Sequence, residues 1–179
     1  MGALFGVIVW RYGISWLTLL LLVAAWAAVV LSAIDIDVRR LPRAIVRPWG
    51  IVTAAIVVVA VVTSHSWWVG ARSLIGAAAL GVLYYGSWFA YRKGLGWGDV
   101  TVAPILGAIL GFVGWPALAV GTFAGFVWGL LGAILPMLRA RSIKGVKIPF
   151  GPWMMLGAAT GVVLGHAISS WYLGKVIGL

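Results

Sequence analysis

Residues 14–34 read ISWLTLLLLVAAWAAVVLSAI, an apolar run without a charged side chain, and Asp35 follows it directly. A helix needs about 20 mostly apolar residues to cross the hydrocarbon core of a bilayer, and this run provides them. Five further stretches are similarly apolar, at 48–64, 73–91, 99–114, 117–137 and 149–173. The sequence therefore predicts an all-α fold, a polytopic membrane protein of about six transmembrane helices joined by short loops.

The composition excludes a water-soluble protein. Hydrophobic residues make up 64% of the chain, charged residues only 9%, and the mean hydropathy is +1.13, so little is left to build a water-facing surface. We expect residues 1–179 to form one membrane-embedded domain with the lipid bilayer as its surroundings. Residues 1–12 are too short to span alone and are interpreted as a partial or surface helix, or as the tail of a longer one.

The formal net charge of +10 would suggest nucleic acid as the partner of a soluble protein. Here the basic residues gather between the apolar stretches, which is the pattern of the positive-inside rule, so no nucleic-acid partner is expected. Three segments rich in arginine and lysine alternate along the chain with connecting segments that have few basic residues. The rule places all three on the cytoplasmic side of a cell membrane. They contain Arg39, Arg40, Arg43 and Arg47; Arg92 and Lys93; and Arg139, Arg141, Lys144 and Lys147.

Small and aromatic residues support the same arrangement. Tryptophans near the predicted helix ends, Trp49 among them, are interpreted as anchors at the membrane surface. Glycines recur at four-residue spacing in the last three helices, and such stripes allow helices to approach closely in lipid. We expect packing within the chain rather than dimerisation, while the oligomeric state stays open; the glycines are Gly107, Gly111, Gly121, Gly125, Gly129, Gly157, Gly161 and Gly165.

The chemistry must use very few groups. The only acidic residues are Asp35, Asp37 and Asp99, and there is no cysteine, which excludes a thiol nucleophile and thiolate metal sites. Asp35 ends the first predicted span and Asp99 begins the fourth, so both fall on the same side at similar depth. Two carboxylates close together in a low-dielectric site hold one shared proton near neutral pH, as in an aspartic protease, and no metal or cofactor is needed.

Glycines surround the second carboxylate, in Gly94-Leu95-Gly96-Trp97-Gly98-Asp99, and would let an extended substrate approach it. An aspartate at a helix N-terminus is also favoured simply by capping and by the helix dipole, and this alternative stays open. Asp37, two residues from Asp35, would point away from it on a helix; it either helps orient the pair or binds a neighbouring arginine.

Three segments carry a resemblance to a known family. Ala33-Ile34-Asp35-Ile36-Asp37-Val38-Arg39-Arg40-Leu41-Pro42, Gly96-Trp97-Gly98-Asp99 and Ile148-Pro149-Phe150-Gly151-Pro152 resemble, in order and spacing, the signature segments of type IV prepilin peptidases. The resemblance implies that Asp35 and Asp99 are the catalytic dyad. It also implies supporting positions around the dyad, which are Asp37, Pro42, Gly96, Gly98, Pro149, Gly151 and Pro152.

The resemblance further implies a membrane aspartyl endopeptidase that removes the short basic leader of type IV prepilins or pseudopilins at the cytoplasmic face of a prokaryotic membrane. Two features depart from the family pattern. Thr101 stands where a lysine usually follows the second aspartate, and the chain lacks the cysteine-rich portion associated with methylation, so peptidase activity without methyltransferase activity is expected. The alternatives are a small ion- or proton-coupled transporter and a catalytically inactive homologue.

Overall fold

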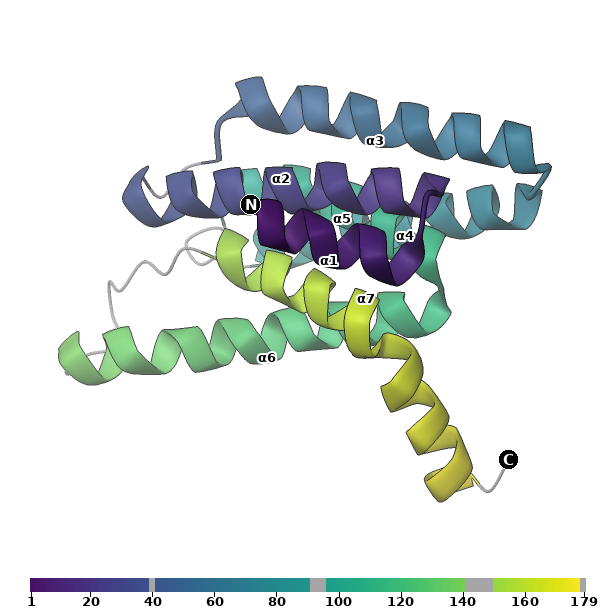
Figure 1. Cartoon of the computed structure of the whole chain (residues 1–179). Coiled ribbons are helices and arrows are strands. Elements are labelled where there is room, and N and C mark those ends of the chain that lie inside the picture. Colours follow the sequence, from purple (N-terminus) through teal and green to yellow (C-terminus); the bar gives the residue numbers. More distant parts are fainter. Residues whose placement is uncertain (39–40, 91–95, 141–149, 178–179) are drawn as a thin grey trace.

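Helices account for almost all of the structure, a computed structural model that describes residues 1–38, 41–90, 96–140 and 150–177 (Figure 1). These residues form seven α-helices and one π-helical turn. The α-helices are α1 (Gly2–Tyr12), α2 (Trp16–Val38), α3 (Arg43–Ser64), α4 (Trp67–Ala90), α5 (Trp97–Val113), α6 (Trp115–Ala140) and α7 (Gly151–Tyr172), and the π-helix η1 (Leu173–Ile177) continues α7.

Five of the described helices are long and apolar enough to cross a membrane, namely α2, α3, α4, α6 and α7. The all-helical, multi-pass class predicted from the sequence is confirmed. The predicted fourth span corresponds to α5, which has 17 residues and is shorter than the other five. Its shortness was visible in the sequence, where the apolar run begins only at Asp99.

Two helices begin at least a full turn earlier than predicted. The start of α3 is Arg43 rather than residue 48, and α4 starts at Trp67 rather than 73. Arg43 and Arg47 lie in the first two turns of α3 with exposed side chains, so a count of apolar residues leaves these turns out. The first turn of α4 is itself apolar, but Arg72 separates it from the apolar run, and the Arg72 side chain binds carbonyls of α5. The N-terminal α1 has no buried residue, and its Tyr12 hydroxyl donates a 3.5 Å hydrogen bond to the Val162 carbonyl.

The most extensive contacts join α4 to α5 and α6 to α7. Glycines form both crossings: a Cβ on Gly107 would collide with the Gly76 carbonyl, and one on Gly157 would collide with the backbone of Gly125. The predicted use of the glycine stripes for packing within the chain is thus confirmed for these positions. Gly76 on α4, which the four-residue pattern did not single out, completes the first crossing.

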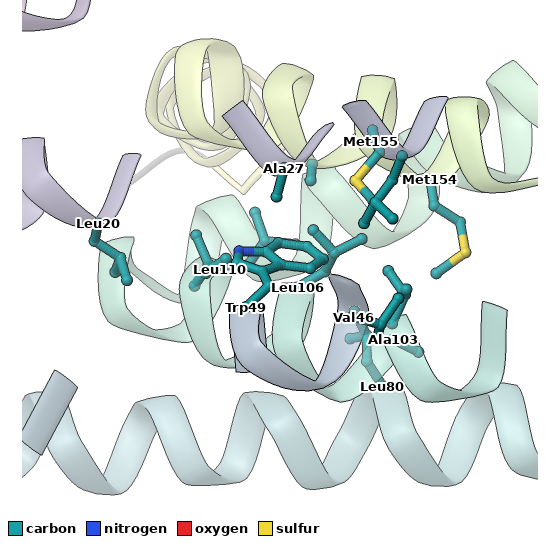
Figure 2. Packing of buried hydrophobic residues seen from close by; sticks show 14 of the residues in the cluster. Leu20, Ala27, Val46, Trp49, Leu80, Ala103, Leu106, Leu110, Met154 and Met155 are labelled. Carbon is teal, nitrogen blue, oxygen red and sulfur yellow. The ribbon is translucent and has the colours of Figure 1, made fainter. Parts of the chain in front are cut away.

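The core lies between α2, α3, α4, α5 and α7, and Figure 2 labels ten of its side chains. Trp49 is only 3% exposed and packs among Leu106 and Leu110, so its interpretation as a membrane anchor was wrong. The error has a simple cause. The helix begins a full turn before the apolar run, which moves Trp49 from its expected place at the helix end into the helix interior.

Candidate active site

The first carboxylate, Asp35, lies one turn before the end of α2 and is buried, with 5% of its surface exposed. Its Oδ2 accepts a 3.2 Å hydrogen bond from the backbone N–H of Gly151, the first residue of α7. Only glycine leaves room for this approach, since a Cβ at position 151 would lie 2.8 Å from Oδ2. The start of α7 therefore holds the Asp35 carboxylate directly.

The second carboxylate, Asp99, lies in the first turn of α5 and is 6% exposed. Its Oδ2 accepts a 3.2 Å hydrogen bond from the backbone N–H of Gly96, the residue that precedes the helix. The dipole of α5 also favours a negative charge at this end. Asp99 thus does cap its helix, as the simpler interpretation of the sequence held, and this role is compatible with a chemical one.

The fold brings the two carboxylates together. Asp35 and Asp99 come from different helices, yet they lie close enough for their charges to interact in the buried interior. Leu41 lies between the two helix starts, because a Cβ on Gly98 would meet its Cβ at 2.8 Å and a Cβ on Gly151 would meet its Cδ1 at 3.6 Å. Two buried carboxylates at this proximity cannot both ionise at low cost, which is the condition for a shared proton.

The other predicted positions divide into three groups. Asp37 is exposed near the end of α2 and takes no part in the contacts between the buried carboxylates. Pro42 immediately precedes α3, Gly96 and Gly98 flank the start of α5, and Pro152 is the second residue of α7, so these four lie at helix starts. Pro149 lies outside the described residues.

Thr101, the departure from the family pattern, has a local partner. Its hydroxyl donates a 2.7 Å hydrogen bond to the carbonyl of Gly98, within the first turn of α5. The side chain therefore turns back onto its own helix, beside Asp99 in the sequence. A threonine here supports the backbone that carries the second carboxylate.

Two residues near the carboxylates were not found from the sequence. Leu41 belongs to the first signature segment, but its side chain has no polar or reactive group. Tyr84 lies within an apolar helix, and no motif in the surrounding sequence indicates a function. The charge of Asp99 interacts with the Tyr84 hydroxyl. Only the packing of α4 against α5 reveals this proximity.

The described residues contain no group of three or more His, Asp or Glu side chains that could hold a metal ion. The two buried carboxylates are thus the chemically distinctive groups of this part of the molecule. That the chain needs no cofactor stays a prediction.

Comparison with known proteins adds a family to this geometry. A model of the type IV leader peptidase family matches residues 22–137. The chain is 31% identical over 176 residues to a prepilin leader peptidase/N-methyltransferase of Stutzerimonas stutzeri, covering 96% of this chain and 58% of that protein. It is 33% identical over 171 residues to a protein of the same description from Pseudomonas putida, covering 90% and 55%.

The chain therefore spans little more than half the length of these curated relatives. No solved structure matches it. The family match includes both Asp35 and Asp99 but ends before Gly151.

Proposed function

Because the chain belongs to the type IV leader peptidase family, we propose that it is an aspartyl endopeptidase that removes the short basic leader of type IV prepilins or pilin-like proteins. The observation that carries the proposal is the pair of buried, interacting carboxylates of Asp35 and Asp99 at the ends of α2 and α5. Each carboxylate is held by the N–H of a glycine, Gly151 for the first and Gly96 for the second.

The reaction follows from one proton shared by two carboxylates. The ionised member takes a proton from a water molecule, whose oxygen attacks the carbon of the scissile peptide, while the protonated member donates its proton to the carbonyl oxygen. A tetrahedral diol forms. It collapses when the nitrogen accepts the proton that the first carboxylate took from water, a diol hydroxyl gives its proton to the other carboxylate, and the C–N bond breaks. The leader then ends in a carboxylic acid, the mature protein begins with a free amine, and the pair again holds one proton.

The substrate class fits the position of the pair along the helices. A prepilin changes from a polar, basic leader to an apolar helix at its cleavage point, so its scissile bond lies where the membrane meets water. Asp35 and Asp99 both lie within a turn or two of a helix end. The basic segments of the sequence assign this end to the cytoplasm by the positive-inside rule.

We confine the proposal to peptide cleavage. The relatives from Stutzerimonas stutzeri and Pseudomonas putida are described as N-methyltransferases as well, and this chain matches little more than half of each. The 179 residues contain no cysteine, the residue in which the family's methylation-associated portion is rich.

The experiment compares the three acidic residues of the chain with one another. The parent and the variants Asp35→Asn, Asp99→Asn and Asp37→Asn are each co-expressed with a candidate prepilin, and leader removal is followed by the mass shift of the pilin. We expect cleavage by the parent and by Asp37→Asn, because Asp37 is exposed and lies outside the carboxylate pair. Asp35→Asn and Asp99→Asn should abolish cleavage while the protein still inserts into the membrane.

Two results would contradict the proposal. A fully active Asp99→Asn variant would remove the dyad mechanism. A parent that inserts correctly but cleaves no member of several pilin classes would favour an inactive homologue. Thr101→Lys, which introduces the residue of the family pattern, would then be the variant to test.

A further inference from the structure

A buried phenol lies beside the proposed dyad. Tyr84 on α4 is 3% exposed, although it belongs to a helix that otherwise shows most of its surface to its surroundings. The antiparallel contacts between α4 and α5 locate it. Gly76 meets Gly107, and a Cβ on Gly81 would lie 3.7 Å from the Cβ of Pro104. Three residues further along α4, the same register places Tyr84 level with the first turn of α5, where Asp99 lies.

Aromatic packing fixes the direction of the ring. Tyr84 stacks on Phe126 of α6 with ring centres 5.6 Å apart and planes inclined by 21°. It also packs against Phe150 at 6.1 Å, and Phe150 directly precedes Gly151, whose N–H holds Asp35. The ring therefore packs against Phe150, the residue before the N–H donor of the first carboxylate, while its hydroxyl lies within electrostatic range of the second.

The Asp99 carboxylate and the Tyr84 hydroxyl both have unused hydrogen-bonding capacity. Among the described residues, Asp99 receives a side-chain hydrogen bond at Oδ2 only, from Gly96, so its Oδ1 has no donor there. Within the same part of the chain the Tyr84 hydroxyl has no hydrogen-bond partner either. Tyr84 is 3% exposed as a whole, so few water molecules can reach its hydroxyl, and the Asp99 carboxylate is an acceptor of the right kind.

We propose that Tyr84 is a positioning residue whose hydroxyl donates a hydrogen bond to the ionised Asp99 carboxylate and orients it toward Asp35. The catalytic consequence rests on the peptidase function proposed above, while the hydrogen bond itself does not. Hydrogen bonds of catalytic groups are commonly long in an unliganded site and shorten when charge develops. The hydroxyl favours the ionised form of Asp99, so it would sustain proton abstraction from water toward the acidic side of the pH range.

Other titratable groups near Asp99 are few. Of the helices packed against α5, α2 contributes Asp35 and α4 contributes Tyr84. Helix α3 carries Arg43 and Arg47 near the same end, with exposed side chains. The described side chains of α6 and α7 bring no titratable group that interacts with Asp99.

The chain offers a matched pair of variants. Tyr84→Phe removes the hydroxyl and keeps the stacked ring, and Tyr85→Phe removes the neighbouring hydroxyl, which is on a side chain 50% exposed. With purified protein and a leader-bearing pilin peptide, we expect Tyr84→Phe to lower kcat about tenfold with KM unchanged. The acidic limb of the kcat/KM profile should move to higher pH, and the thermal midpoint should stay that of the parent. Tyr85→Phe should match the parent in each respect.

A second readout does not depend on cleavage. In an Asp35→Asn, Asp37→Asn background, Asp99 is the only remaining acidic side chain, so infrared difference spectra report on its carboxylate. Adding Tyr84→Phe should shift the carboxylate stretching band, and adding Tyr85→Phe should not. An unshifted band, or a Tyr84→Phe enzyme with the parent's kcat and pH profile, would overturn the proposal. A parent that cleaves nothing would contradict the proposed function, while the infrared band would still decide the hydrogen bond.

Discussion

At the scale of single residues, the candidate site depends on glycines as much as on carboxylates. Gly151 and Gly96 donate the N–H groups that hold Asp35 and Asp99, and Gly98 makes room for Leu41 between them. A glycine is needed at 151 because of space, since its backbone does not adopt a left-handed conformation. The geometry of the site is therefore sensitive to the smallest possible side chain.

We expect Gly151→Ala to impair cleavage without unfolding the protein. The added methyl group would lie 2.8 Å from Oδ2 of Asp35 and 3.3 Å from its Cγ, so the carboxylate must move. Because the obstacle is the end of a side chain, the fold can adjust, but displacing a reacting group by about 1 Å can cost about 100-fold in rate. Cleavage rate and thermal midpoint, measured on the same preparation, separate the two effects.

Gly86→Ala provides the control for this substitution. Gly86 lies within α4, and a Cβ built there meets nothing within 4 Å. We expect an unchanged cleavage rate and, because alanine favours helix more than glycine does, a slightly raised stability of up to about 1 kcal/mol. Parental cleavage by Gly151→Ala would show that the contact between α7 and Asp35 has no bearing on the reaction.

At the scale of helices, Arg72 of α4 caps the C-terminal end of α5. Its side chain reaches from the second turn of α4 to the last turn of α5, where Nε donates to the Gly111 carbonyl and Nη2 donates to the Phe112 carbonyl at 2.7 Å. The final carbonyls of a helix lack partners within the helix and carry its partial negative charge. The Arg72 guanidinium donates hydrogen bonds to two of these carbonyls and places a positive charge beside them.

Arg72→Gln should therefore destabilise the protein by about 1–3 kcal/mol, the usual value of a hydrogen-bonded charge at such a position. Arg72→Lys should lie between the parent and Arg72→Gln, because it keeps the charge but loses the fork of two donors. Unfolding in detergent measures all three. Lys175→Gln, which removes an exposed charge from η1, is the control and should have the parent's stability; an equal loss in both glutamine variants would mean that only net charge matters.

At the scale of the whole molecule, the alternation of helices places the two buried carboxylates at one end of the bundle. The site gathers the end of α2 with the starts of α5 and α7, and an antiparallel path brings these three ends together (Figure 1). By the positive-inside rule we expect this end of the bundle to face the cytoplasm. The opposite end holds the connection between α3 and α4.

Single cysteines test this orientation cleanly, because the parent has none. We expect a membrane-impermeant maleimide to label Ser64→Cys, at the end of α3, on intact cells. Ala90→Cys, at the end of α4, should react only after permeabilisation. Both side chains are exposed, so access to reagent is not limited by packing. The reverse pattern would place the dyad outside the cell and contradict cleavage of a cytoplasmic leader.

The sequence by itself determined the membrane class, the approximate spans and the two candidate aspartates. Apolar length and charge distribution dictate insertion almost independently of packing. With only three acidic residues in the chain, few carboxylate pairs were possible. The true starts of α3 and α4 were missed because arginines near these ends interrupt the apolar runs, and a count of apolar residues stops at a charge.

The tertiary structure decided what surrounds the carboxylates. Close approach of the helices decides several contacts: the hydrogen bond from Gly151 to Asp35, the place of Leu41 between the starts of α5 and α7, the position of Tyr84 and the partners of Arg72. Pairs of glycines on different helices allow that approach. A single sequence shows the stripe on each helix but not which stripe faces which. Contacts between residues distant in the chain are a property of the packed bundle, and they turn two isolated aspartates into one candidate site.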